Sequence, residues 1–361
     1  MADHARYHRQ MLLPEIGPAG QQRLLDSHAA VIGCGALGSC IADSLARAGV
    51  GRLTIVDRDL LDLTNLQRQV LYDEQDLADG LPKAEAARRR LARINSTIAI
   101  DAIVDDVNPS NVEAIVSDAT VIVDGLDNFE TRYLLNDVSV KRGIPYVYGG
   151  AVATHGMTAT FLPHASPAGR PPREWDDYVG PCLRCLFDAA PPAGTSLTCD
   201  TAGVLGPIVG VIANMQAAEA IKILTGRFDA VSRDLTTIDL WHGEHQSLNI
   251  AGAHRAGECL CCGQGKFEHL CGEFAGATAS LCGREAVQIV PRAASQTDLA
   301  ALAARLEPHG RVEHNRFLLR AHVRDSTGPI DLTVFPNGRA IIKGTSRPEI
   351  ARGIYAKYVG S

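Results

Sequence analysis

A glycine-rich turn between an apolar strand and an amphipathic helix constrains the fold of this chain most strongly. Residues 31–38 read VIGCGALG, and residues 36–48 have the periodicity of an amphipathic helix. Gly33, Gly35 and Gly38 suit a strand-to-helix turn, which requires positive φ and close approach of the backbone. The N-terminus of the following helix would attract phosphate groups. We therefore expect a nucleotide here, although NAD, FAD, S-adenosylmethionine and ATP would all fit.

The next hundred residues continue to alternate between strand and helix patterns. We expect further strands at 52–57, 98–104, 119–124 and 145–151, helices at 83–94, 109–116 and 128–142, and later an apolar helix at 207–224. Strands joined by crossover helices form a mostly parallel sheet that is covered on both faces, with ligands at the carboxyl ends of the strands. The expected fold class is α/β, doubly wound and Rossmann-like.

The pattern divides the chain into three parts. Residues 1–27 are expected to form an N-terminal arm, and residues 28–270 the nucleotide-binding domain. Residues 271–361 are expected to form a small C-terminal α+β module with the order β-α-β-β-β-α. Its Asn-Gly pair at 337–338 predicts a hairpin turn, because this dipeptide readily supplies positive φ. This module could dock a partner or stabilise a dimer, and the sequence does not choose.

Composition narrows the functional classes. With 361 residues, 46% hydrophobic and 21% charged, the chain is typical of soluble globular proteins. A formal net charge of −6 shows no basic footprint, so nucleic acid is not expected as a partner. The N-terminus lacks a signal peptide, and no run approaches ~18 uninterrupted apolar residues. We expect a cytoplasmic protein without a membrane partner.

Charged residues follow the strands at the edge where a ligand should bind. Asp57 is placed to accept hydrogen bonds from ribose hydroxyls, and Arg68 could hold phosphate oxygens through two parallel hydrogen bonds. Lys83 begins a helix, where a lysine is more often ordinary surface. Asp127 and Asn128 precede another helix; an aspartate there is often only an N-cap, but beside a triphosphate it is also a natural Mg²⁺ ligand. Hydride transfer has no use for Arg68, which disfavours an NAD-dependent oxidoreductase.

Two cysteine pairs predict a metal site. Cys182 and Cys185, like Cys259 and Cys262, are separated by two residues, a spacing that lets both sulfurs of a pair face one ion. Four thiolates form a closed structural Zn²⁺ site, although free loop thiols are the alternative. Cys261 lacks the required spacing and is left out.

Cys199 has a different setting from these pairs. It lies among small and polar residues shortly before the apolar helix, where solvent access and a helix start would favour the reactive thiolate. A catalytic role and an inert loop thiol both remain open.

Several motifs in order resemble one known family. RYHRQ at 6–10, GCGALG, Asp57, NLQRQ at 65–69, LPKAEAA, GLDNFETR, PCLRC and the apolar helix are similar to the ThiF/MoeB/HesA family, the bacterial relatives of ubiquitin-activating enzymes. The resemblance covers residues 4 to 265. It implies that the chain uses ATP to adenylate the C-terminal glycine of a ubiquitin-like sulfur-carrier protein. The reaction would release pyrophosphate and serve sulfur transfer in thiamin or molybdopterin synthesis.

The resemblance also assigns roles to residues. It implies an ATP-binding adenylation domain in which the nucleotide contacts are Gly38, Asp57, Thr64, Asn65, Arg68, Lys83, Asp127 and Asn128, with Asp127 holding Mg²⁺. Arg9 matches an arginine that reaches the γ-phosphate region of a neighbouring protomer, which implies a homodimer. Cys199 matches a cysteine that links covalently to the carrier in some members. Arg9, Arg68, Lys83, Asp127 and Cys199 are thus the expected catalytic residues.

Other functions stay open at this stage. A member of the same superfamily could act on a tRNA base or a peptide, because these enzymes share the nucleotide site. An NAD-dependent oxidoreductase and a non-catalytic scaffold are weaker alternatives. A scaffold would have no reason to retain Arg9, Arg68, Lys83 and Asp127 together.

Overall fold

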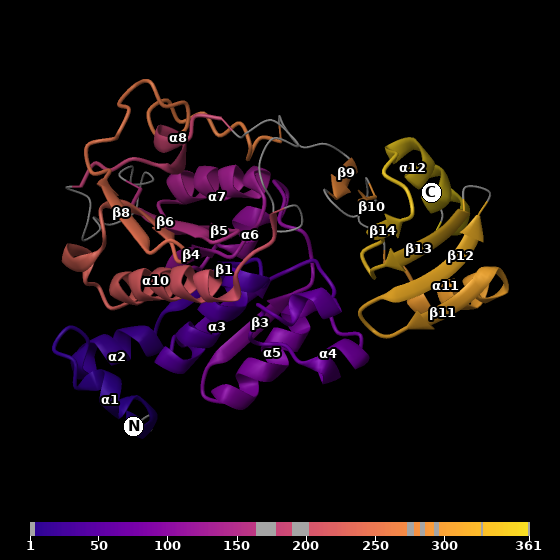
Figure 1. Cartoon of the computed structure of the whole chain (residues 1–361), viewed down its shortest axis with the longest axis horizontal. Helices are drawn as coiled ribbons and strands as arrows, with labels where there is room; N and C mark the ends of the chain where they lie inside the picture. Colours follow the sequence, from indigo (N-terminus) through magenta and orange to yellow (C-terminus); the bar gives the residue numbers. More distant parts are fainter. Residues whose placement is uncertain are drawn as a thin grey trace. The chain divides into compact units, whose positions relative to one another are not determined.

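The computed structural model describes residues 4–163, 178–189, 202–272, 278–281, 286–291, 296–325 and 328–359. The chain divides into two compact units, Met1–Phe274 and Ala275–Ser361 (Figure 1). Each unit has its own sheet.

The first unit is built on an eight-stranded sheet with the order β3-β2-β1-β4-β5-β6-β7-β8. The strands are β1 (His28–Ile32), β2 (Arg52–Val56), β3 (Ala99–Ile103), β4 (Val121–Asp124), β5 (Tyr146–Val152), β6 (His155–Phe161), β7 (Asp234–Asp239) and β8 (Glu244–Asn249). Pairing is parallel from β3 through β5 and antiparallel from β5 to β8. The expected doubly wound α/β fold is therefore confirmed, on a sheet that is mixed overall.

Helices connect and cover these strands (Figure 1). They are α3 (Ala36–Ala48), α4 (Glu74–Ala78), α5 (Lys83–Ile94), α6 (Val112–Ile115), α7 (Phe129–Arg142), α8 (Leu183–Leu186) and α10 (Gly206–Leu224), with 3-10 turns η2 (Leu63–Asn65) and η3 (Phe228–Ala230). The helices at 36–48 and 83–94 have their expected bounds. The helix expected at 109–116 is reduced to α6, because Asn108 and Asn111 bond their side chains to nearby backbone amides instead.

The apolar helix α10 belongs to the core. By length and composition it could cross a membrane, but 56% of that window is buried inside the protein. It packs against α3, β5 and β6. A core helix of a folded domain meets the same length and composition criteria.

The N-terminal arm is folded onto the far end of α3. It consists of η1 (His4–Tyr7), α1 (His8–Met11) and α2 (Gly17–Leu25). Tyr7 is buried and its hydroxyl accepts a hydrogen bond from Asn95 Nδ2 at 2.8 Å. Gln10 Nε2 donates to the carbonyl of Ala48, the last residue of α3, at 3.0 Å. The arm therefore lies at the end of α3 opposite the glycine turn.

The second unit is an antiparallel six-stranded sheet with the order β11-β12-β13-β14-β10-β9. Its elements are β9 (Thr278–Leu281), β10 (Ala286–Ile289), α11 (Leu299–Leu306), η4 (Glu307–His309), β11 (Gly310–His314), β12 (Leu319–Asp325), β13 (Gly328–Val334), β14 (Ala340–Lys343) and α12 (Pro348–Tyr358). The structure adds β9 and β11 to the expected strands. Residues 335–339 turn between β13 and β14 with Gly338 at φ +79°, so the hairpin is confirmed.

Candidate nucleotide and metal sites

The glycine turn is shaped by backbone packing at the carboxyl end of β1. Gly33 has a φ of +86°, which favours glycine. A Cβ on Gly38 would lie 1.9 Å from the carbonyl oxygen of Gly33, and one on Gly125 would lie 2.3 Å from the same oxygen. Gly35 differs, because its nearest atom would be Gln69 Nε2 at 3.8 Å. The fold thus requires three of these glycines, and Gly35 leaves open space at the turn.

Asp57 holds the turn from the neighbouring strand end. Its Oδ2 accepts from the backbone N–H of Cys34 at 2.7 Å, and its Oδ1 accepts from the N–H of Asp59 at 2.7 Å. Burial raises the pKa of Asp57, although Lys83 opposes this. Tyr72 donates its hydroxyl to the carbonyl of Cys34 at 2.6 Å. Asp57 therefore has a structural task in addition to the expected ribose contact, which stays a prediction.

The segment after β2 brings the next three expected residues together. Asp62 caps η2: its Oδ1 accepts from the N–H of Thr64 at 2.9 Å and from its hydroxyl at 2.7 Å. Asn65 is buried and its Oδ1 accepts from the Asp62 N–H at 3.1 Å. Arg68 Nη1 donates to the carbonyl of Thr64 at 2.8 Å. One of the five guanidinium N–H donors of Arg68 is thus engaged in positioning its own loop.

Lys83 is a buried cation among carboxylates. The residue is only 4% exposed, and its Nζ lies 3.0 Å from Asp59 Oδ2. Burial opposes the charged form of Lys83, but nearby carboxylates, above all that of Asp59, outweigh it and raise the pKa of Lys83. Asp57 and the exposed Asp127 add to this effect. The interpretation of Lys83 as an ordinary surface lysine is wrong, and its partner Asp59 was not expected from the sequence.

A buried ion pair holds the loop after β4. Arg132 Nε lies 3.1 Å from Asp124 Oδ2, with side chains 7% and 0% exposed. Arg132 Nη2 also donates to the carbonyls of Leu126 at 2.7 Å and Gly149 at 2.8 Å. Burial raises the pKa of Asp124, and the charge of Arg132 works against that shift. This pair fixes the path of the chain toward Asp127.

Asn128 caps the helix that carries Arg132. Its Oδ1 accepts from the N–H of Thr131 at 2.9 Å, so it is the N-cap of α7. Arg132 lies in the segment GLDNFETR, but it was not among the residues expected from the sequence. The available signal was its position four residues after Asn128, close to Asp124 at the strand end. A contact role for Asp127 and Asn128 with nucleotide stays a prediction.

Arg9 does not lie near the glycine turn of its own chain. It is an exposed residue of α1, beside the contact of Gln10 with the last residue of α3. Because α3 has 13 residues, its two ends are about 20 Å apart. If Arg9 acts on a nucleotide, it must do so in another copy of the chain.

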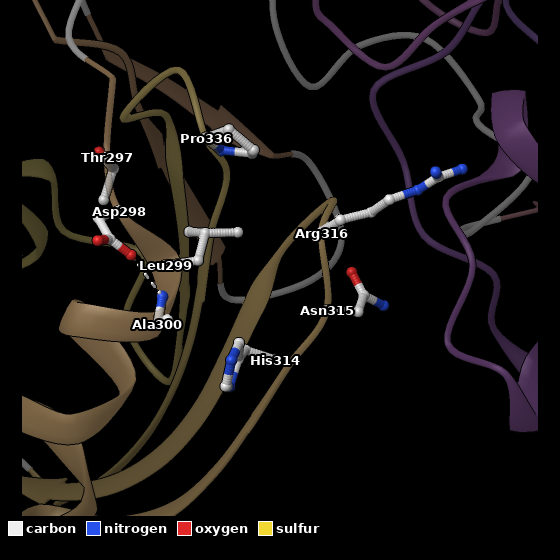
Figure 2. A pocket seen from close by; sticks show the side chains of 8 residues that line it. All are labelled: Thr297, Asp298, Leu299, Ala300, His314, Asn315, Arg316 and Pro336. Atoms are coloured by element: carbon white, nitrogen blue, oxygen red, sulfur yellow. Dashed lines mark hydrogen bonds between the residues drawn. The ribbon is translucent and has the colours of Figure 1, made fainter.

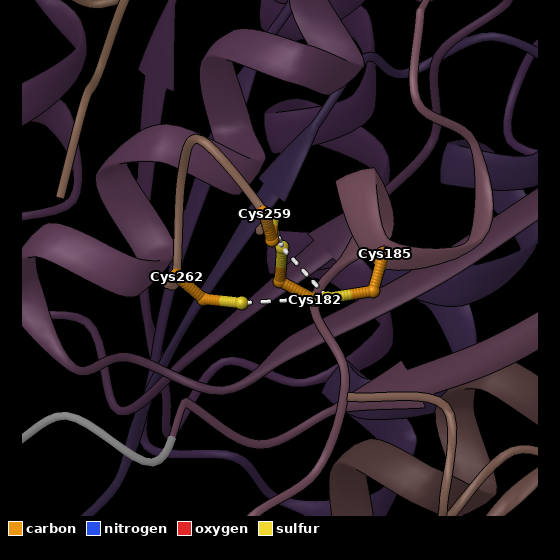
Figure 3. Close-up of side chains that lie close together, drawn as sticks. All are labelled: Cys182, Cys185, Cys259 and Cys262. Atoms are coloured by element: carbon orange, nitrogen blue, oxygen red, sulfur yellow. Dashed lines mark hydrogen bonds between the residues drawn. The ribbon is translucent and has the colours of Figure 1, made fainter. Parts of the chain in front are cut away.

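The four expected cysteines converge, as Figure 3 shows. The sulfurs of Cys182, Cys185, Cys259 and Cys262 all lie within 4.8 Å of one another. The S···S separations are 4.0 Å for Cys182–Cys185, 3.7 Å for Cys182–Cys259 and 3.4 Å for Cys185–Cys262. A tetrahedron of sulfurs ~2.3 Å from Zn²⁺ has edges of roughly 3.8 Å, so the donor set fits such an ion. The cluster can hold a metal.

Cys261 is not one of the four converging sulfurs, and its spacing had left it out of the expected set. It is buried, and its Sγ accepts from Asn136 Nδ2 at 3.3 Å. Cys199 belongs to residues 190–201, which lie outside the described part of the chain. Its expected catalytic role therefore stays a prediction.

A cavity of about 430 Å³ lies within the C-terminal unit. Figure 2 shows its lining side chains, which come from the start of α11, the β11–β12 turn and Pro336. Asp298 is the N-cap of α11, and its Oδ1 accepts a hydrogen bond from the N–H of Ala300 at 3.0 Å. None of the residues expected from sequence to act on a nucleotide or metal lines this cavity.

Comparisons with known proteins identify the family to which the chain is similar. The model of the ThiF family matches residues 7–261. The sulfur carrier protein ThiS adenylyltransferase of Bacillus subtilis (strain 168) is 41% identical over 357 residues, which span 98% of this chain and 99% of the relative. The SAMP-activating enzyme E1 of Haloferax volcanii is 38% identical over 72% of this chain and 89% of its own length.

The solved structures that resemble this chain show its fold. The crystal structure of E. coli MccB with succinimide has a TM-score of 0.58 at 24% identity, covering 72% of this chain and 74% of that one. Another structure, of E. coli MccB with ATP, has a TM-score of 0.54 at 23% identity, covering 68% of each chain. The family match and the two curated relatives confirm the sequence-based resemblance: this chain belongs to the ThiF family.

Proposed function

We propose that this chain uses ATP to adenylate the C-terminal glycine of a ubiquitin-like sulfur-carrier protein. The observation that carries the proposal is the buried Lys83 cation, held by Asp59 at 3.0 Å beside the glycine turn of a ThiF-family domain. The relative that spans nearly the whole chain is named a ThiS adenylyltransferase, which favours the thiamin branch over the molybdopterin branch. The cytoplasmic location expected from the sequence is part of the proposal.

In this proposal the glycine carboxylate of the carrier attacks the α-phosphate of ATP. A bond forms between that carboxylate oxygen and phosphorus, the bond to the bridging oxygen of the β-phosphate breaks, and pyrophosphate leaves. No side-chain nucleophile is needed. Lys83 and Arg68 would stabilise the charge that develops on the phosphates, and the open space at Gly35 would admit them beside the N-terminus of α3.

Carboxylates and cysteines would hold two different metals. Asp127 would bind Mg²⁺, which neutralises phosphate charge and orients the leaving group. The four cysteines would bind Zn²⁺ as a structural ion. Metal analysis of the purified protein tests the second assignment, with Cys182→Ser as the variant that should lose the ion.

The central experiment is carrier-dependent exchange of pyrophosphate into ATP. With a carrier that ends in Gly-Gly, we expect exchange and an acyl-adenylate in the intact mass of the carrier. Lys83→Met should reduce exchange by at least ~100-fold, because a buried charge that stabilises the transferring phosphates is lost. Lys141→Met is the matched control, since Lys141 forms a surface ion pair with Glu113. Absence of exchange with every such carrier would reject the proposal.

We further propose a homodimer in which Arg9 completes the site of the other copy. Its exposure and its place at the far end of α3 support this arrangement. Arg9→Ala alone and Lys83→Met alone should both be inactive. Mixing equal amounts of the two variants should restore up to about a quarter of wild-type exchange. About half of the dimers then contain one copy of each variant, and one of the two sites in each such dimer is intact. Failure of the mixture to recover activity would contradict composite sites without affecting the proposed reaction.

Cys199 offers a separate test within this function. If it links covalently to the carrier only after adenylation, Cys199→Ala should leave pyrophosphate exchange unchanged and remove any covalent adduct from the mass spectrum. Loss of exchange in this variant would instead give Cys199 a role in the first step.

A further inference from the structure

Helix α7 contacts both the cysteine cluster and the loop that follows β4. The loops that follow β1, β2 and β4 carry most of the expected nucleotide contacts and are called the nucleotide edge below. Its N-cap Asn128 and its residue Arg132 shape the loop after β4. One turn further on, Asn136 and Asp137 are buried, with exposed fractions of 1% and 0%. These two neighbouring side chains face the segments that carry the cysteines.

Asn136 contacts the first cysteine segment through both ends of its amide. Its Oδ1 accepts from the N–H of Leu183 at 2.8 Å, between the two cysteines of that pair. Its Nδ2 lies 3.7 Å from Cys182 Sγ and 3.3 Å from Cys261 Sγ. The amide thus spans the two segments and donates toward a sulfur of the proposed metal site.

Asp137 holds the second segment just beyond its cysteines. Its Oδ2 accepts from the N–H of His269 at 3.0 Å and from that of Leu270 at 3.3 Å. Tyr133, on the same helix, stacks on His269 with ring centroids 5.0 Å apart and donates its hydroxyl to the carbonyl of Phe187 at 2.9 Å. The backbone on both sides of the cluster is therefore fastened to α7.

We propose that Asn136 is a positioning residue of the metal centre, and that α7 links this centre to the loop beside the nucleotide. A donor to a ligand sulfur stabilises the thiolate and fixes its direction, and such outer contacts are typically worth 10–100-fold in metal affinity. The role of Asn136 rests on the metal proposed above, and the link through α7 rests in addition on the proposed nucleotide site. Loss of the ion would separate the two cysteine segments from each other and so loosen their hydrogen bonds to α7, whose N-cap is Asn128.

The test compares the zinc affinity of the full-length protein and its variants by competition with a chromogenic chelator. Asn136→Leu, which keeps the volume and removes both hydrogen-bonding ends, should bind zinc about 10–100-fold more weakly. Asn136→Asp keeps the acceptor for Leu183 and removes the donor, so it should also bind zinc more weakly. It serves as the test variant if the leucine variant does not fold. Asn95→Leu is the control, because Asn95 is equally buried but bonds Ala46 and Tyr7.

The outcomes separate positioning from general destabilisation. Asn95→Leu should lower thermal stability and leave zinc affinity within about threefold of wild type. Equal loss of zinc affinity in both leucine variants, unchanged affinity in the Asn136 variants, or a wild-type protein that binds no zinc would each overturn the inference. Binding of a non-hydrolysable ATP analogue should weaken when zinc is stripped from the wild type, and an unchanged affinity would reject the link through α7.

Discussion

The nucleotide edge and the cysteine cluster, although joined by α7, are stabilised in opposite ways. At the nucleotide edge the charges are already paired within the protein: Arg132 with Asp124, and Lys83 with Asp59. In the cluster, four sulfurs lie within 4.8 Å of one another and a cation is the natural compensation for their thiolate form. The first region should keep its shape without ligand, whereas the second should depend on an ion.

The largest effect is expected from removing the metal. Structural zinc sites contribute on the order of 10 kcal/mol or more of apparent binding free energy, and in this protein the ion would join segments 77 residues apart in sequence. Treatment with a strong chelator should lower the thermal unfolding midpoint, and added Zn²⁺ should restore it. Metal analysis should verify that the ion has been removed. If the unfolding midpoint is then unchanged, the cluster, like the nucleotide edge, keeps its shape without a ligand.

The next largest effect should come from the buried pair at the nucleotide edge. Asp124→Asn leaves the Arg132 charge without its partner, and breaking a buried pair in this way costs about 3–5 kcal/mol. The control is Asp101→Asn, since Asp101 pairs with Arg52 at the surface with side chains 48% and 46% exposed. A surface pair contributes about 0–1 kcal/mol. Chemical denaturation should therefore separate the two variants, and equal losses would contradict the importance of burial.

Local sequence patterns predicted the part of the fold that depends on periodicity. The bounds of α3 and α5 matched because their apolar residues recur every three or four positions between clear end signals. The antiparallel half of the sheet was not foreseen, since β8 is exposed along its whole length and carries no apolar alternation. The two additional strands of the C-terminal unit were likewise missed.

The sequence also predicted the residues of the candidate sites better than the hydrogen bonds and ion pairs that hold those residues in place. The cysteine pairs could be recognised because two-residue spacing is a local property. The contact of Asp137 with the His269 backbone joins residues 132 positions apart, and no local pattern announces it. The same holds for Lys83 and Asp59, which are 24 residues apart. Such pairings are set by strand order and become visible only in the folded chain.

Two glycines of the nucleotide turn should respond differently to the same substitution. Gly38→Ala would place a Cβ 1.9 Å from the Gly33 carbonyl oxygen, so we expect a loss of about 1–3 kcal/mol in unfolding free energy. Gly35→Ala meets no atom closer than 3.8 Å and should leave stability nearly unchanged. Its methyl group would instead occupy the proposed phosphate position and weaken ATP binding, measured by calorimetry. Equal stability losses would mean that the turn is more deformable than its packing indicates.

The smallest effect should come from Glu85, on the same helix as Lys83 but paired with two half-exposed arginines. Arg88 and Arg89 donate to its carboxylate at 2.8–2.9 Å, and the hydrogen bond from Arg88, partly offset by burial, lowers the pKa of Glu85 from 4.5 to about 2. A lowered pKa stabilises the folded state above pH 4.5, and this contribution disappears as the pH falls from 4.5 toward 2. Because the arginines are 39% and 42% exposed, solvent screening reduces the expected cost of Glu85→Gln to about 1 kcal/mol at pH 7.

Unfolding of the wild type and Glu85→Gln by urea at pH 7, 4 and 2.5 should show this gap narrowing with acid. Asp124→Asn, measured at pH 7 and 4, is the buried pair to compare with Glu85→Gln. The Asp124 carboxylate is fully buried and its partner Arg132 is 7% exposed, so solvent screens this pair less. A gap for Glu85→Gln that did not change with pH would show that this side chain acts through packing rather than through charge. In that case buried pairs such as Lys83–Asp59 and Arg132–Asp124 would stabilise this unit through charge where the half-exposed Glu85 pairs do not, which would sharpen the contrast with the ion-dependent cluster.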